Sequence, residues 1–233
     1  MVKEIILLTE SIEVEPLTEV LHKYAPTTPV THVVTRRNLD VVVETGLAGK
    51  LLIGFCTPVI VSKSILNALE GPAYNFHPGP PNFPGLFPAC FAIYSCARRF
   101  GVTAHEMSEN VDEGPVVGVE WVDIPLDIDR IHLEAKSHQL IIQLFERLVP
   151  EMVKGVPLTH TEDQWSGYVT RKKDFETICE VPCDISLAEL ELRYRAVGQG
   201  PSHSLNIKLH GVRFNLDTGA DDGKVYNGGR EVT

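Results

Sequence analysis

The sequence predicts an α/β fold with a mainly parallel sheet, followed by a small α+β extension at the C-terminus. Over the first 155 or so residues, short apolar runs of strand length alternate with stretches of helical apolar spacing. After Gly155 this alternation ends and the composition changes. We therefore expect a main domain over residues 1–155, an extension over 156–216, and a Gly- and Asp-rich tail over 217–233 that is prone to disorder.

The elements of the main domain follow in order along the chain. Strands are expected at residues 4–9, 30–35, 50–55, 72–76, 102–107 and 116–122. Helices are expected at residues 15–24, 62–70, 89–98 and 127–154, the last capped by Asp127 or Asp129 and stopped at Gly155. Residues 36–40 are charged and are interpreted as a loop. Loops at the carboxyl ends of parallel strands carry the sites of such folds.

The extension has fewer and shorter elements. Residues 168–170 have the composition of a short strand, and a helix is expected at 187–196 with Ser186 as its cap. Residues 204–209 and 212–216 flank His210 and Gly211, which predicts a β-hairpin.

Composition limits the partners. The net charge of −10 disfavours nucleic acid, whose phosphates need clustered Lys and Arg; the basic clusters here are short. The apolar runs have the length of strands, so no membrane span is expected, and the N-terminus is interpreted as a strand and not as a signal peptide. The hydrophobic content of 43% is typical of a soluble globular protein.

The cysteines and glycines exclude two common kinds of site. The five cysteines are odd in number and scattered, which favours reduced thiols in a cytoplasmic protein. Cys179 and Cys183 lack the second pair that a zinc site needs, so no metal is expected. A Gly-x-Gly-x-x-Gly fingerprint is absent after the first strand, and so is a P-loop.

Two segments carry the chemistry. Residues 74–85 contain Asn75, His77 and a proline-rich loop, and residues 101–117 contain Asp112 before a Gly-Pro turn. Asn75 and His77 are two apart on an extended segment, so they share a face, and the turn can bring Asp112 to His77. A carboxylate there raises the pKa of the imidazole and favours its cation, which together with an amide N–H stabilises an oxyanion. Such a set serves acyl transfer to an amine when the enzyme supplies no nucleophile. The alternative is a structural histidine and a plain turn aspartate.

The two segments together resemble a known family. Asn75-Phe76-His77-Pro78, with Pro81 and Gly85 beyond it, resembles the Asn-x-His-Pro-Ser-Leu-Leu-Pro loop of 10-formyltetrahydrofolate-dependent formyltransferases. Residues 101–105 and 111–117 resemble that family's Gly-Val-Thr-x-His and Asp-Thr-Gly-Pro segments. The resemblance covers about residues 1–155 and implies the Rossmann-like formyltransferase fold, with 10-formyltetrahydrofolate as formyl donor and Asn75, His77 and Asp112 as catalytic residues.

The resemblance also implies the surroundings of the reacting groups. The donor pocket is lined by the loop after the third strand and by the segment that leads to Asp112. The donor-binding residues so implied are Phe55, Cys56, Thr57, Met107, Glu109 and Val111. The family's Ser-Leu-Leu-Pro is replaced here by the segment that we assign to acceptor binding, Gly79, Pro80, Pro81 and Asn82. His105 is interpreted as structural or pocket-lining, and Trp165 as a packing residue.

The acceptor is the least determined part. Glu10, Glu13 and Glu15 follow the first strand where a phosphate loop would be needed for glycinamide ribonucleotide, and the acidic chain disfavours tRNA. What remains is a small-molecule amine, with an amino sugar on a nucleotide carrier as our leading hypothesis. Water as acceptor, giving a formyltetrahydrofolate hydrolase, and a non-catalytic folate-binding module are the alternatives. Residues 187–216 are expected to support a homodimer.

Overall fold

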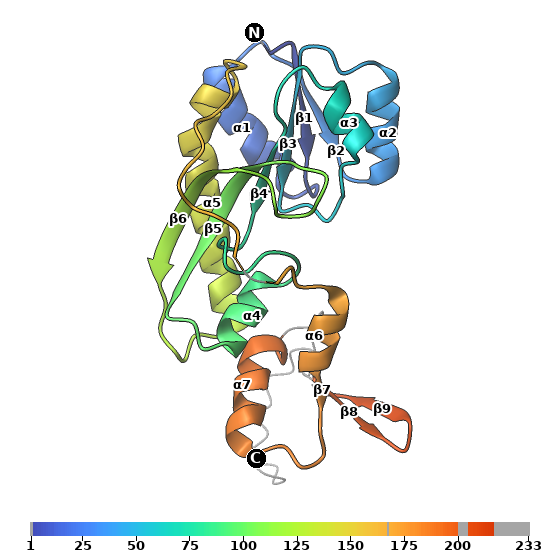
Figure 1. Cartoon of the computed structure of the whole chain (residues 1–233), viewed down its shortest axis with the longest axis vertical. Coiled ribbons are helices and arrows are strands. Elements are labelled where there is room, and N and C mark those ends of the chain that lie inside the picture. The colour runs from blue at the N-terminus through green and yellow to red at the C-terminus, as the bar shows by residue number, and fades with distance from the viewer. Residues whose placement is uncertain (1, 167, 200–204, 217–233) are drawn as a thin grey trace, which may run out of the picture.

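The structure, a computed structural model, describes residues 2–166, 168–199 and 205–216. The chain forms a six-stranded sheet in the order β2-β1-β3-β4-β5-β6 and a three-stranded sheet in the order β7-β8-β9 (Figure 1). The strands are β1 (Glu4–Leu8), β2 (Val30–Val33), β3 (Lys50–Phe55), β4 (Tyr74–His77), β5 (Arg99–Glu106), β6 (Val116–Asp123), β7 (Glu180–Val181), β8 (Asn206–Leu209) and β9 (Val212–Asn215). The helices are α1 (Val14–Tyr24), α2 (Arg36–Glu44), α3 (Lys63–Ala68), α4 (Pro88–Tyr94), α5 (Arg130–Met152), α6 (Lys172–Cys179) and α7 (Leu187–Val197).

The strand direction in the large sheet changes between β4 and β5. Strands β2, β1, β3 and β4 are parallel, whereas β5 runs antiparallel to both β4 and β6. The β5–β6 connection spans residues 107–115, too short for the crossover that parallel neighbours need, so an antiparallel pair results. The predicted α/β class with a mostly parallel sheet is confirmed.

Helices cover both faces of this sheet (Figure 1). On one face, Leu17 and Leu21 of α1 and Phe145 of α5 are buried in a core that includes Phe55 and Phe76 from the strands. On the other face, α2 and α3 bury apolar side chains against β1 and β3. The long α5 begins at the predicted cap Asp129, whose carboxylate accepts from the backbone N–H of His132.

A second hydrophobic core lies at the lower end of the molecule in Figure 1, where α4, α6 and α7 meet. It joins Ala92 and Ile93 of α4 to Phe175 and Ile178 of α6 and to Val197 of α7. Packing is therefore continuous across residue 155, the predicted domain boundary. We call this part, with β7, β8 and β9, the C-terminal lobe.

Two helices were not predicted from the sequence. Residues 36–40, interpreted as a loop, belong to α2, which Thr35 and Asn38 open with a capping box and which buries Leu39 in the core. The basic stretch at residues 171–173 begins α6. In both helices the charged residues lie in the first turn. They make the helical spacing of the apolar residues that follow difficult to recognise in the sequence.

The extension matches its predictions more closely. Ser186 caps α7 by accepting from the backbone N–H of Glu189, and β8 and β9 form the predicted hairpin around His210 and Gly211. The strand expected at 168–170 is reduced to one bridge between Thr170 and Gly85. The predicted tail, 217–233, and Ser204 lie outside the described residues.

Candidate active site

The predicted catalytic side chains come together on the neighbouring strands β4 and β5 and on the loop that follows β5. Asn75 and His77 lie on β4, and the antiparallel register of β5 sets His105 opposite Asn75 and Thr103 opposite His77. Asp112 comes from the β5–β6 loop, where its backbone adopts the left-handed region with φ of 49°, which aspartate tolerates better than most residues. The strand register and the β5–β6 loop therefore place these side chains in one region of the sheet.

Asp112 lies between two imidazole rings. Its Oδ2 is 3.3 Å from Nδ1 of His77 and its Oδ1 is 3.4 Å from Nε2 of His105. The backbone N–H of Gly85 also donates to Oδ2, at 2.8 Å. His77 and Asp112 are each only 5% exposed, so these charges and dipoles interact with little screening by water.

Burial sets the protonation of this group. It tends to raise the pKa of Asp112, but the neighbouring His77 and His105 and the Gly85 N–H outweigh it, so the pKa lies below its usual range. Burial lowers the pKa of His77, against the opposing effects of Asp112 and of the Phe83 carbonyl. The sequence-based expectation that the carboxylate raises the pKa of His77 was therefore wrong in direction, because desolvation outweighs the carboxylate.

The proline-rich loop closes over His77. Nε2 of His77 lies 3.1 Å from the carbonyl oxygen of Phe83, so the ring contacts an acceptor at each nitrogen. A neutral imidazole carries one proton and can donate to only one of them. Nε2 donates to the Phe83 carbonyl, whereas Nδ1 and the Asp112 carboxylate form an ion-pair contact at 3.3 Å.

His105 is more than the structural residue that the sequence indicated. Its Nδ1 donates to the carbonyl of Glu106 at 2.8 Å, which directs Nε2 toward the Asn75 amide nitrogen, 3.1 Å away, and toward Asp112. It therefore positions both the amide and the carboxylate. Its position opposite Asn75 depends on the β4–β5 register, which the linear sequence does not reveal.

Trp165 covers the site from a segment beyond α5. Its ring stands edge-on to His77, with centroids 5.7 Å apart, and to His105, with centroids 5.0 Å apart. Its indole N–H donates to the carbonyl of Gly114 at 2.8 Å. Trp165, which the sequence indicated as a packing residue, therefore packs against the imidazole rings of His77 and His105.

Residues 166 and 168–170 lie along the proline-rich loop, and we call them the strap. The N–H of Ser166 donates to the carbonyl of Pro81. The N–H of Thr170 donates to the carbonyl of Pro84, and the Thr170 carbonyl accepts from the N–H of Leu86. Gly85, with φ of 93°, faces this strap so closely that a Cβ would lie 2.3 Å from the Thr170 carbonyl oxygen. Only glycine fits there. The start of the extension therefore holds the loop in place.

Two of the residues assigned to donor binding, Thr57 and Met107, lie close to Asn75 around Gly54. A Cβ on Gly54 would lie 2.8 Å from Oδ1 of Asn75, 2.8 Å from Cε of Met107 and 3.2 Å from Cγ2 of Thr57, so these three side chains converge there. Oδ1 of Asn75 is buried and has no hydrogen-bond partner within the described part of the chain. A buried acceptor without a donor indicates a place for a ligand N–H.

Other predicted donor residues lie elsewhere. Phe55 does not fit the prediction, because its side chain is fully buried in the core against Phe76 and Phe145. Glu109 pairs with Lys63 on the surface. Val111 is exposed, and burial raises the pKa of the neighbouring strand-end thiol of Cys56 to about 12.

The segment assigned to acceptor binding is mostly inaccessible. Gly79, Pro80 and Pro81 are buried, and the Gly79 carbonyl accepts from the Thr103 hydroxyl at 2.8 Å. A Cβ on Gly79 would lie 2.7 Å from Nε2 of His77, so this glycine lets the loop approach the imidazole. Asn82 alone of the four is exposed.

Searches for metal and membrane features in the described ranges found none. No cluster of three or more His, Cys, Asp or Glu side chains in residues 2–166, 168–199 and 205–216 is arranged to hold a metal ion. None of the helices described is long and apolar enough to cross a bilayer.

Comparison with known proteins finds a family match for part of this region. Residues 47–149 match the family model described as formyl transferase, which confirms the predicted resemblance over that range. The methionyl-tRNA formyltransferase of Wolbachia pipientis is 25% identical over 137 residues, 58% of this chain and 46% of that protein. A second curated relative of that description is covered over 58% of its length, so the chain spans about half the length of these relatives.

Solved structures share the fold over most of the chain. The sugar N-formyltransferase from Shewanella has a TM-score of 0.74 at 17% identity, covering 91% of this chain and 96% of that one. The N-formyltransferase from Helicobacter canadensis, in complex with folinic acid and dTDP-3-aminofucose, has a TM-score of 0.64 at 16% identity, covering 84% of this chain and 80% of that one.

Proposed function

Because residues 47–149 form a formyl transferase domain, we propose that the protein moves a formyl group from 10-formyltetrahydrofolate to a primary amine of a small molecule. The acceptor that we propose is a nucleotide-linked amino sugar, the class to which the dTDP-3-aminofucose of the Helicobacter canadensis structure belongs. The observation that carries the proposal is the buried Asp112 between His77 and His105, beside Asn75.

The donor site fits the residues around Gly54. The unpartnered Oδ1 of Asn75 offers an acceptor to a ligand N–H, and Thr57 and Met107 supply an apolar wall. 10-Formyltetrahydrofolate supplies a formyl carbon that is already activated for attack by an amine. The protein therefore needs to orient the two substrates, stabilise charge on the formyl oxygen, and move one proton.

His77 is suited to move that proton. In our proposal the neutral ring carries its proton on Nδ1, 3.3 Å from Asp112, once the Phe83 carbonyl has withdrawn, so that Nε2 can act as a base; the lowered pKa of His77 favours this neutral form. In our proposal Nε2 takes a proton from the attacking amine and returns it to the departing nitrogen of the folate. Asp112 stabilises the imidazolium during that interval, as in other carboxylate–imidazole pairs.

Asn75 is suited to bind the formyl oxygen. Its amide nitrogen carries two N–H groups, of which one faces His105 at 3.1 Å, so the other is left for the oxygen on which negative charge develops. His105 and Trp165 then act as positioning residues. His105 holds the amide of Asn75, and Trp165 restrains both imidazole rings.

One observation favours the second candidate, a folate-binding module without turnover. Nε2 of His77 faces the carbonyl of Phe83, which occupies the direction from which an amine would approach. Catalysis therefore requires the loop to withdraw that carbonyl when substrates bind. A loop that never withdraws it would leave folate binding and no transfer.

One assay separates these functions. Tetrahydrofolate release from 10-formyltetrahydrofolate is followed with a dTDP-amino sugar, with methionyl-tRNA, or with neither, and formate is measured in parallel. We expect release only with the amino sugar, together with a formamide product. Release with formate and without amine would replace the transferase by a hydrolase. Transfer to methionyl-tRNA alone would move the acceptor to the class of the curated relatives, and folate binding without release would favour the module.

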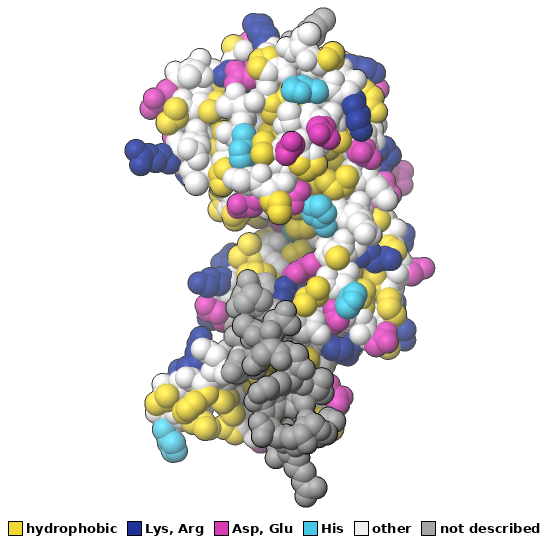
Figure 2. All heavy atoms as spheres, turned by 180° about the vertical axis from the view of Figure 1, so that it is seen from behind, with side chains coloured by type: hydrophobic (Ala, Val, Ile, Leu, Met, Phe, Trp, Pro, Cys, Tyr) yellow, Lys and Arg dark blue, Asp and Glu magenta, His cyan; other side chains and the backbone are white. Residues whose placement is uncertain are grey.

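We also propose that the protein is a homodimer that associates through the hairpin. Figure 2 shows apolar side chains gathered on the C-terminal lobe, and on the hairpin Val212 is 57% and Phe214 is 51% exposed. Exposed apolar faces of this kind are typical of association surfaces. Light scattering on the wild type and on Phe214→Ser should give a dimer and a monomer, respectively. A monomeric wild type would remove this proposal.

A further inference from the structure

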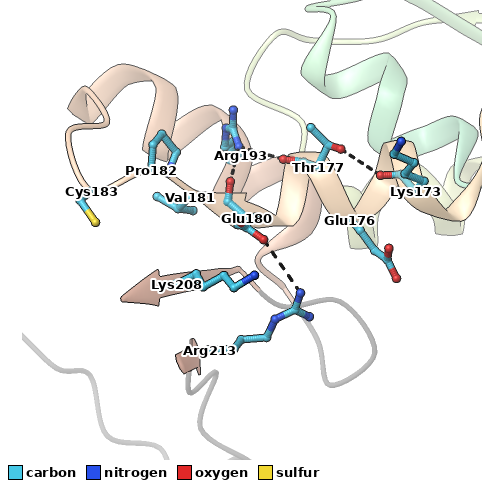
Figure 3. Close-up of a pocket in the computed structure, with 10 residues that line it drawn as sticks. All are labelled: Lys173, Glu176, Thr177, Glu180, Val181, Pro182, Cys183, Arg193, Lys208 and Arg213. Carbon is cyan, nitrogen blue, oxygen red and sulfur yellow. Dashed lines mark hydrogen bonds and ion pairs between the residues drawn. The ribbon is translucent and has the colours of Figure 1, made fainter. Parts of the chain in front are cut away.

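The C-terminal lobe contains a groove far along the chain from the catalytic motifs (Figure 3). Its volume is about 540 Å³, within the range of small-molecule sites. It is lined by residues of α6, β7, α7 and the hairpin: Lys173, Glu176, Thr177, Glu180, Val181, Pro182, Cys183, Arg193, Lys208 and Arg213. Four of these side chains are cationic and two are carboxylates, in a chain whose net charge is −10.

The hairpin is inverted relative to an ordinary surface hairpin. Asn206 is buried and its side-chain amide donates to the carbonyl of Cys179, so the face with Asn206 and Lys208 turns toward the lobe. The other face, with Val212 and Phe214, is exposed. A half-buried antiparallel pair normally turns its apolar face inward. Here the charged face is the one that lines the groove.

Two cations are set directly opposite each other on that face. Lys208 of β8 and Arg213 of β9 are cross-strand partners, a position in which like charges repel and destabilise the pair. Glu180 compensates weakly, because its carboxylate is 4.0 Å from Arg213 and both side chains are about half exposed. Folding alone gives no reason for this arrangement. An anion bound between the two cations does.

The C-terminus of α6 would not repel an anion in the groove. Carbonyl groups at a helix C-terminus carry partial negative charge and would repel one. Arg193 donates to the carbonyls of Thr177, Ile178 and Glu180 at 3.2, 3.1 and 2.9 Å, which neutralises that end. Figure 3 shows Arg193 directed at this helix end while Lys208 and Arg213 lie together on the other side of Glu180.

The remaining charges support the same reading. Glu176 pairs with Lys172, which lies outside the groove lining, at 3.9 Å. Lys173 and Lys208 have no ion pair among the residues that the structure describes, although both line the groove. Cations from α6, β8 and β9 therefore surround one space, which suits a group with several acceptor oxygens better than a single carboxylate.

We propose that this groove binds a phosphate-bearing small molecule through its diphosphate, with Lys173, Lys208 and Arg213 as the contacting side chains. The proposal is independent of formyl transfer, because it uses none of the residues around His77. The diphosphate can come from a nucleotide or from inorganic pyrophosphate, and the chemistry of the contact is the same.

The test is a calorimetric titration of the full chain with pyrophosphate and, separately, with dTDP. The variant is Lys208→Thr with Arg213→Thr, since threonine keeps the strand propensity of the hairpin. Its matched control is Lys23→Ala with Arg37→Ala, two exposed cations on α1 and α2 whose removal changes the net charge equally. All three proteins keep the His77 site.

We expect the wild type and the control to bind pyrophosphate, and the groove variant to bind it at least about tenfold more weakly. Binding should weaken as salt rises, because the contact is between exposed charges. The dTDP bound in the groove is the part of the binding that the control keeps and the groove variant loses; if that part is tighter than the binding of pyrophosphate, the source is a nucleotide, and if it is equal, the diphosphate alone is recognised. No binding to the wild type, or equal affinity in the groove variant and the control, would overturn the proposal. Far-UV circular dichroism verifies that the variant is folded.

Discussion

The site at β4 and β5 and the groove of the C-terminal lobe differ in how their charged side chains are buried and paired. At the β4–β5 site, Asp112 is buried and already contacts two imidazoles and a backbone N–H. In the groove, Lys208 and Arg213 are exposed, face each other and have one loose ion pair. The first arrangement is complete before a ligand arrives, whereas the second is stabilised only when an anion binds.

The comparison teaches how each site should respond to substitution. Removing one member of a buried, mutually satisfied set leaves its partners unpaired in a poorly screened environment, which has a large cost. Removing one of two repelling surface cations costs nothing or stabilises the chain. The predictions below test this contrast, beginning with the largest expected effect.

The largest effect is expected at the pair His77 and Asp112. His77→Ala or Asp112→Asn should lower turnover by about 10²- to 10⁴-fold, the usual contribution of a positioned acid–base group, and leave donor affinity nearly unchanged. Turnover is measured as tetrahydrofolate release under saturating donor. His138→Ala is the control, because this exposed histidine pairs with Glu13 on the surface and should keep full turnover. Undiminished turnover in Asp112→Asn would contradict the proposed roles.

A smaller effect is expected at Trp165. Trp165→Phe keeps an aromatic ring beside the imidazoles but removes the hydrogen bond to the Gly114 carbonyl, which should cost about 1 kcal/mol of unfolding free energy. Turnover should fall about fivefold, since about 1 kcal/mol applied to the positions of His77 and His105 corresponds to that factor. Kinetics and thermal melts are compared for the same preparations. An unchanged kcat with a lowered Tm would reduce Trp165 to a packing residue.

The stability of the protein should depend on pH through the same pair. The pKa of His77 is lowered from 6.5 and that of Asp112 from 3.8, so below each of these values the unfolded chain binds more protons than the folded one. Unfolding free energy should therefore be maximal above about pH 6.5 and decrease as pH falls through the folded pKa of His77. The slope should reach at most about 1.4 kcal/mol per pH unit for one proton. Urea titrations of His77→Gln should show a flatter profile, and a profile identical to the wild type would contradict the assignment.

The smallest effect has the opposite sign. Without phosphate and at low salt, Lys208→Thr with Arg213→Thr should raise the unfolding free energy by about 0.2–1 kcal/mol, because cross-strand repulsion is removed. The double variant at Lys23 and Arg37 serves again as the control for net charge. Urea midpoints of both variants and of the wild type give the comparison. A clear loss of stability confined to the hairpin variant would mean that these cations support the fold.

The sequence was sufficient for most strands and for the proximity of Asn75, His77 and Asp112. That proximity could be predicted because Asn75 and His77 are two apart on β4 and Asp112 lies in the short loop between β5 and β6. His105 and Trp165 could not be assigned in the same way, because their roles depend on strand register and on a segment 51 residues beyond Gly114 that folds back onto the site.

The protonation of the site was predicted in the wrong direction for a physical reason. A motif shows that a carboxylate accompanies His77, but it does not show how deeply the ring is buried, and desolvation decides the direction of its pKa. The same limit applies to α2, whose charged first turn was interpreted as a loop, and to α6, which was not predicted; the burial of Leu39 and Phe175 defines these helices. Charged residues in a sequence predict surface exposure better than they predict secondary structure.

The central claim is that a formyl-folate donor binds beside Asn75, Thr57 and Met107, where His77 and Asp112 act on it. Calorimetric titration with a stable 10-formyltetrahydrofolate analogue tests it most directly, using the wild type, Asp112→Asn and Met107→Ala. The account predicts binding to the wild type, nearly equal affinity in Asp112→Asn, and clearly weaker binding in folded Met107→Ala. No binding to the wild type would contradict the claim, and the chain would then share the fold of the formyltransferase structures without their function.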